Sequence, residues 1–147
     1  MRMTVKGIIG LLLFMILIAS CNAVEYTHQT KDIAGRFYDG GWSWGFVTIT
    51  ITGDSFHANY DPGSRLNPGT IDGTITKCLY PDNPQPDKIG WCINDAAWTD
   101  TKSVNGNEIR TGTVTFWISN TDIDWITGST KDNNGNPTGS VTLRRRS

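Results

Sequence analysis

Short apolar segments with a period of two residues, separated by turn-forming residues, run from residue 33 to the C-terminus and constrain the fold more than any other feature. Thr, Ile, Val and aromatic residues dominate the segments, whereas Gly, Asn, Asp and Pro dominate the intervals. This alternation is typical of half-buried strands, and no segment keeps a helical period over three turns. The pattern predicts eight strands: Ile33–Tyr38, Trp42–Thr52, Ser55–Tyr60, Thr70–Tyr80, Ile89–Asn94 with an extension toward Thr99, Ile109–Ser119, Ile123–Thr130 and Thr138–Arg146.

The intervals between these segments are short, and short connections make neighbouring strands antiparallel. Closing eight such strands removes both exposed sheet edges, and a barrel of this size is filled by side chains or holds one small ligand. We therefore expect an all-β fold, an antiparallel up-and-down β-barrel of about eight strands. A β-sandwich of the same strands is the alternative, because the sequence does not show whether the first and last strands pair.

The N-terminus has the layout of a secretory signal. Arg2 and Lys6 precede Gly7–Ala19, a run of apolar residues and Gly. A bilayer span needs about 20 apolar residues, so this run fits the core of a signal peptide better than a membrane helix.

The run ends in Leu17-Ile18-Ala19-Ser20-Cys21, which resembles the lipobox of bacterial lipoproteins. The resemblance implies that Cys21 receives a diacylglycerol thioether and becomes the mature N-terminus. It divides the chain into a signal peptide at 1–20, a lipid-anchored tether at 21–32 and one domain at 33–147. Asn22, where an Asp would retain a lipoprotein at the inner membrane, favours the outer membrane. The alternative is an ordinary secretory signal with a chance Cys.

The domain resembles small secreted barrels of the lipocalin and avidin superfamilies in general plan. The likeness lies in Gly35-Arg36-Phe37-Tyr38 followed by a Trp-bearing strand. No diagnostic motif of either family is present. The resemblance therefore implies an architecture and carries no ligand residues to this chain.

Cys78 and Cys92 form an even pair once Cys21 is assigned to lipid. A secreted protein matures in an oxidising compartment, so the pair predicts a structural disulfide that closes a Pro-rich loop. A metal or redox pair is the alternative, but the two Cys lie far apart for a Cys-x-x-Cys motif, and the sequence near them holds no His or third Cys.

The charge and the scarcity of His limit the function classes. A net charge of −1 gives no support for phosphate-mediated binding of nucleic acid. His57 is alone on its predicted strand. Asp122 and Asp124 are close in sequence, and Asp124 could face Asp72 across strands, so paired carboxylates could serve glycoside hydrolysis; solvated turn and strand acids are the favoured alternative. We expect no catalytic group, cofactor or metal ion.

The Trp residues are the candidate binding groups. Trp42 and Trp44 stand outside the core if their strand continues without a bend, although Gly45 would permit a bulge that changes their face. Trp117 shares a face with Thr and Ser. An exposed Trp indicates a contact, and we expect Trp42, Trp44 and Trp117 to bind. Half or more of the six Trp are expected to pack in the core or to plug the ends of the barrel.

These features predict a lipid-anchored, non-catalytic binding protein of the bacterial envelope that presents aromatic residues to a glycan, a small ligand or a protein. One alternative is an envelope lipoprotein that inhibits an enzyme or blocks a receptor, as the small lipoprotein inhibitors of lysozyme do. A small hydrolase that uses aspartates is a third hypothesis. The terminal Arg144-Arg145-Arg146 is a basic run in which Arg144 and Arg146 point outward if Leu143 points inward.

Overall fold

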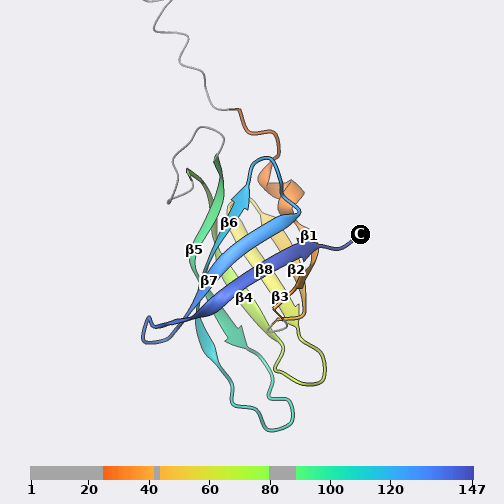
Figure 1. The fold of residues 1–147 in the computed structure, drawn as a ribbon, viewed down its shortest axis with the longest axis vertical. Coiled ribbons are helices and arrows are strands. Elements are labelled where there is room, and N and C mark those ends of the chain that lie inside the picture. Colours follow the sequence, from red (N-terminus) through yellow and green to blue (C-terminus); the bar gives the residue numbers. More distant parts are fainter. Residues whose placement is uncertain (1–24, 42–43, 80–88) are drawn as a thin grey trace, which may run out of the picture.

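The computed structural model of the chain describes residues 25–41, 44–79 and 89–147, and its regular structure is almost entirely β (Figure 1). One short 3-10 helix, η1 (Thr30–Ile33), precedes the strands. The strands are β1 (Gly35–Asp39), β2 (Phe46–Thr52), β3 (Ser55–Asp61), β4 (Gly69–Leu79), β5 (Ile89–Asp100), β6 (Thr111–Ser119), β7 (Trp125–Asp132) and β8 (Pro137–Arg145). Each predicted strand has its counterpart, with boundaries that differ by a few residues.

The eight strands form a closed barrel in sequence order, and every neighbouring pair is antiparallel. Closure depends on β1 and β8, which pair through Phe37 and Arg145, Tyr38 and Arg144, and Asp39 and Leu143. The up-and-down β-barrel is therefore confirmed, and the β-sandwich is wrong because the first and last strands do pair.

Side chains fill the barrel interior, and β6 illustrates how the sequence achieves this. Val114, Phe116 and Ile118 point inward and are at most 1% exposed, whereas alternate residues of the strand lie on the outer wall. Residues from every strand join them in one hydrophobic cluster. An eight-stranded barrel is narrow enough for such filling.

The strand predicted to begin at Trp42 begins instead at Phe46, because the chain bends at Gly45. Gly45 has a φ of +61°, and a Cβ there would lie 2.5 Å from the carbonyl oxygen of Asp61. The bend changes the inward face, so that Trp44 and Val47 are both buried although they lie three positions apart, an odd spacing that would place them on opposite faces of a regular strand. The expectation that Trp44 stands outside the core is therefore wrong, and the alternative of a bend at Gly45 holds.

The two ends of the barrel carry different connections (Figure 1). The N-terminal end holds residues 25–34, the turn at 53–54, the connection at 120–124 and the C-terminus. The distal end holds the connections at 62–68, 101–110 and 133–136. Arg145 ties the C-terminus to the N-terminal end by donating a 2.9 Å hydrogen bond to the carbonyl oxygen of Ala34.

The described part of the predicted tether lies against the N-terminal end. The Tyr26 ring packs 5.2 Å from that of Trp91, and its hydroxyl donates to the carbonyl oxygen of Gly90 at 3.1 Å. Ile33 of η1 is fully buried in the core. Residues 25–33 thus cover this end of the barrel. No helix in the described ranges is both long and apolar enough to cross a membrane.

The predicted disulfide is confirmed: Cys78 of β4 and Cys92 of β5 are joined, with a Cα–Cα distance of 5.9 Å. Cys92 lies on the outer wall, opposite Thr76 on one side and Trp117 on the other. The bond therefore ties two neighbouring strands just before a connection that lies, from residue 80 to residue 88, outside the described residues.

Candidate functional site

The residues predicted to bind do not come together. Trp44 is 4% exposed in the core, where its ring stacks on that of Tyr60 at 5.6 Å. Trp117 is half-buried on the outer wall beside the disulfide. Trp42 and the predicted lipid attachment residue Cys21 lie outside the described residues.

A different set of aromatic residues forms a lateral row on the outer wall, in which Phe46 and Trp125 are exposed and Tyr38 is half-buried. The strand register places Trp125 of β7 opposite Arg144 of β8, Arg144 opposite Tyr38 of β1, and Tyr38 opposite Phe46 of β2. Arg36 and Arg146 flank the row, and the Arg146 amide bonds to the carbonyl oxygen of Arg36 at 2.9 Å. We call these residues the arginine–aromatic row: Arg36, Tyr38, Phe46, Trp125, Arg144 and Arg146.

Each flanking or central guanidinium in the row lies over a ring. The Arg144 Cζ is 4.0 Å from the centroid of the Trp125 ring. The corresponding distances are 5.4 Å from Arg146 to Tyr38 and 5.6 Å from Arg36 to Phe46. These contacts keep the guanidinium groups against the wall by cation–π attraction.

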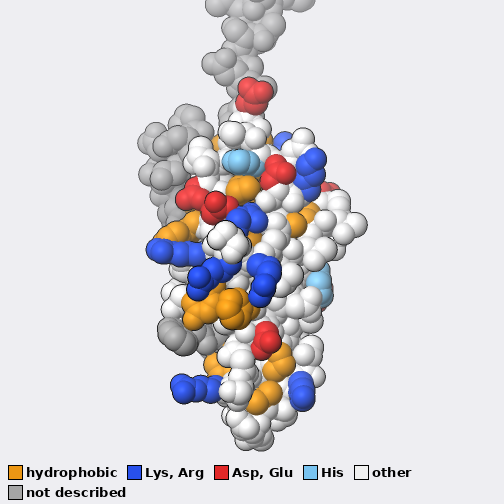
Figure 2. Space-filling model, turned by 90° about the vertical axis from the view of Figure 1, so that its right-hand side faces the viewer, with side chains coloured by type: hydrophobic (Ala, Val, Ile, Leu, Met, Phe, Trp, Pro, Cys, Tyr) orange, Lys and Arg blue, Asp and Glu red, His pale blue; other side chains and the backbone are white. Residues whose placement is uncertain are grey.

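The row stays open to solvent although it contains large apolar surfaces. Phe46 is 46% exposed and Trp125 is 39% exposed. The face drawn in Figure 2 has Lys and Arg side chains beside exposed hydrophobic ones. Monomeric domains seldom leave grouped aromatic rings in water unless the rings contact something.

The charge of the row is uncompensated within the described part of the chain. Arg36, Arg144 and Arg146 form no ion pair there. Arg145 differs, because its guanidinium pairs with the Asp124 carboxylate at 2.5 Å and also donates to backbone oxygens. Three outward guanidinium groups therefore face no carboxylate among the described residues.

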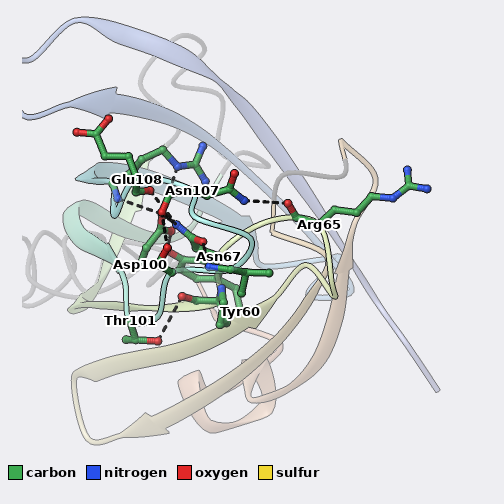
Figure 3. Close-up of polar contacts among 11 residues, drawn as sticks. Tyr60, Arg65, Asn67, Asp100, Thr101, Asn107 and Glu108 are labelled. Carbon is green, nitrogen blue, oxygen red and sulfur yellow. Dashed lines mark hydrogen bonds and ion pairs between the residues drawn. The ribbon is translucent and has the colours of Figure 1, made fainter.

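At the distal end, a buried carboxylate organises a polar network (Figure 3). The Asp100 side chain is fully buried and accepts hydrogen bonds from the Tyr60 hydroxyl at 2.7 Å and from the Asn67 amide at 3.2 Å. The backbone amide and Nε of Arg110 also donate to it, at 3.0 and 3.2 Å. Asn67 further donates to the carbonyl oxygen of Glu108 at 2.8 Å, which joins two distal connections.

This environment sets the ionisation of the two central groups. Burial alone raises the pKa of Asp100, but the hydrogen bonds from Tyr60, Arg110 and Asn67 outweigh it and lower the pKa below its ordinary value. Burial, with the neighbouring Asp100 carboxylate, raises the pKa of Tyr60. Asp100 is thus held as a carboxylate and Tyr60 as a neutral phenol.

The candidate catalytic side chains, His57 and Asp124, contact other side chains. The His57 Nδ1 lies 2.6 Å from the Asp72 carboxylate, and its Nε2 lies 3.1 Å from the Asn59 amide. Both ring nitrogens therefore have partners on the exposed wall, and Asp124 pairs with Arg145. The described ranges contain no cluster of His, Cys, Asp or Glu able to hold a metal ion.

The alternation of inward and outward residues in the sequence predicts the outward position of some residues of the arginine–aromatic row. Outward positions for Arg144 and Arg146 follow from an inward Leu143, which the structure buries completely. Tyr38 alternates with the buried Phe37 in the same way. The chain as a whole has no match among protein-family models, curated proteins or solved structures, so its candidate functions rest on this geometry.

Proposed function

We propose that this chain is a lipid-anchored, non-catalytic binding protein of the bacterial envelope, and that it captures a protein partner with an acidic surface. The observation that carries the proposal is the arginine–aromatic row, which combines exposed rings with uncompensated guanidinium groups. Trp, Tyr and Arg are the residue types that dominate the binding energy of protein interfaces.

The chemistry of the row specifies the partner. A guanidinium presents its N–H groups as a planar fork that matches a carboxylate, and stacking on a ring reduces the freedom lost on binding. Arg144 and Arg146 are held in this way over Trp125 and Tyr38. A partner with Asp or Glu around an apolar centre would pair with the guanidinium groups and cover the rings.

The proposed anchor would restrict where that partner is found. Tyr26, which packs on Trp91, lies five positions after Cys21. A chain of that length extends at most about 17 Å. A barrel anchored at Cys21 would stay close to the bilayer, and the partner would be a protein of the same membrane surface. Confinement there raises the effective concentration without additional contacts.

A photo-crosslinker tests the row in the full-length lipoprotein in intact envelopes. Benzoylphenylalanine at Phe46 should crosslink to a protein, whereas the same group at Ala97, an exposed site on β5, should not. Arg144→Glu should abolish the Phe46 product because it places like charge against an acidic partner. Equal products at both sites, or a product that persists in Arg144→Glu, would contradict the proposal. Crosslinks to lipid alone would assign the row to the membrane.

The anchor is tested separately with radiolabelled palmitate. Label should enter the wild-type chain and be absent from Cys21→Ala. Label that remains in the variant would rule out the lipobox assignment while leaving the row as a binding surface.

Inhibition or exclusion is the second candidate function, and the rigidity of the row favours it. Its four central residues lie on consecutive hydrogen-bonded strands, not on loops. A preformed surface loses little freedom on binding and suits a blocking role. Once the crosslinked partner is identified, its activity with wild-type protein and with Arg144→Glu would distinguish inhibition from simple capture.

A further inference from the structure

A second candidate site lies at the distal end, away from the row. A cavity of about 470 Å³ opens there between the β7–β8 hairpin and the residues that lead into β6. Its size falls within the range of ligand pockets, roughly 300–1,000 Å³. Trp44 and Trp98 line it from the core, and Glu108, Arg110, Asp132 and Thr138 are among the polar residues around it.

The floor of this cavity is aromatic. Trp98 is 7% exposed, and its ring lies 6.4 Å from that of Trp44. The Trp98 Nε1 is buried and has no hydrogen-bond partner among the described residues. An indole N–H can only donate, and a buried donor without an acceptor is destabilising.

The walls offer both donors and acceptors. Arg110 uses its Nε for Asp100, and no described residue accepts from its two terminal guanidinium nitrogens. Glu108 uses its carbonyl oxygen in the network, while its carboxylate extends away from that network without a described donor (Figure 3). The Thr138 hydroxyl donates to that of Thr130 at 2.9 Å. Unused hydrogen-bonding capacity of both kinds therefore surrounds an aromatic floor.

We propose that the distal cavity binds a neutral saccharide. Sugar hydroxyls both donate and accept, so they match a wall that holds a guanidinium, a carboxylate and Thr hydroxyls. The C–H face of a sugar ring suits the apolar floor formed by the Trp side chains. A strongly anionic ligand would meet Glu108 and Asp132, and a cationic ligand would meet Arg110.

The buried network makes this site rigid before a ligand arrives. Tyr60 stacks on Trp44 and donates to Asp100, which in turn holds Arg110. The floor and one wall are thus connected through a single carboxylate. A preformed pocket binds without the cost of ordering its own side chains.

The test follows the Trp98 indole N–H by two-dimensional NMR in the full-length lipoprotein, held in phosphocholine detergent micelles that contain no sugar. The probes are glucose, N-acetylglucosamine and their β-1,4-linked dimers, with glucuronate and glucosamine as charged controls. At least one neutral probe should shift the Trp98 signal saturably, and the charged monosaccharides should bind about tenfold more weakly than the neutral one. No saturable shift with any neutral probe, or tighter binding of a charged one, would overturn the proposal.

Two variants locate the site. Thr138→Phe should fill the cavity mouth and remove the saccharide-induced shift, whereas Ser129→Phe, exposed on the outer wall of β7, should leave it unchanged. Glu108→Ala removes one exposed acceptor and should weaken binding about fivefold to tenfold, as the loss of one hydrogen bond does. The Glu108 variant keeps the test decisive if Thr138→Phe disturbs the fold. Affinity unchanged by Glu108→Ala and Thr138→Phe would place the saccharide elsewhere and contradict the proposal.

Discussion

The outer row and the distal end both combine Arg with aromatic rings, but they use the combination in opposite ways. In the row, Arg144 lies 4.0 Å from the Trp125 ring, and no carboxylate compensates it among the described residues. At the distal end, Arg110 lies 5.9 Å from the Trp98 ring and pairs with the buried Asp100. The first arrangement leaves the guanidinium and the ring exposed, whereas the second ties the guanidinium Nε to a buried carboxylate and encloses most of the ring.

Burial explains the difference between the two regions. A charge that is fully enclosed needs several hydrogen bonds to balance its lost hydration, and Asp100 receives them from three side chains and one backbone amide. The guanidinium groups of the row remain hydrated and need no such compensation. We therefore expect loss of the buried Asp100 carboxylate to change stability strongly, and substitutions in the row to change it little.

Asp100→Asn should have the largest effect on stability. It leaves the hydrogen bonds of a buried network unbalanced and should reduce the free energy of unfolding by about 3 kcal/mol. Asp72→Asn, which breaks the exposed contact with His57, should cost about 0–1 kcal/mol. Urea denaturation of both variants measures the difference. Similar losses would show that burial does not set the cost of removing a carboxylate from this barrel.

Gly45→Ala should cost about 2–3 kcal/mol, because it adds a clash to an unfavourable backbone conformation. The new Cβ would lie 2.6 Å from the Cα of Pro62. Gly53→Ala is the matched control, since Gly53 has a φ of +58° but no atom within 4 Å of its Cβ position. Gly53→Ala should cost about 1–2 kcal/mol, because it forces a residue with a Cβ into the left-handed conformation without adding a clash. Thermal unfolding of the Gly45→Ala and Gly53→Ala variants measures the difference, which is the cost of the steric clash at Gly45. Equal losses of stability in the two variants would show that the clash contributes nothing.

The distal network should also make stability depend on pH. The pKa of Asp100 is lowered in the folded state, so its contribution is complete above the unfolded pKa of about 3.9. The contribution is lost as the pH falls below that value and through the folded pKa. Unfolding curves from pH 6 downward should show this loss in the wild-type chain and a smaller one in Asp100→Asn. An identical dependence in both would exclude Asp100 as its source.

Substitutions in the row should have the smallest effect on folding. Trp125→Ser and Arg144→Ser remove exposed groups, so each should change the free energy of unfolding by about 0.5 kcal/mol or less. Urea denaturation checks this, and partner crosslinking at Phe46 should nevertheless fall in both. A loss of stability comparable with that of Asp100→Asn would make the row a structural element and would weaken the proposed function.

Local pattern predicted much of the strand content, because the alternation of inward and outward residues is a property of neighbouring positions. Val114, Phe116 and Ile118 were assignable to the core in this way, and Cys78 and Cys92 were assignable to one disulfide. The candidate site was predicted less well. The burial of Trp44 depends on the left-handed backbone conformation of Gly45, which reverses the face that points inward. Sequence periodicity alone does not reveal that conformation.

The amino-acid sequence by itself determined where strands and turns form, their antiparallel order and the bonding of the two domain cysteines, because these depend on short-range pattern and on composition. Only the tertiary structure decided closure, since β1 and β8 pair across more than a hundred residues. That same pairing places Tyr38 beside Arg144 and so creates the row. A surface assembled from distant strands depends on their register, which no single segment encodes.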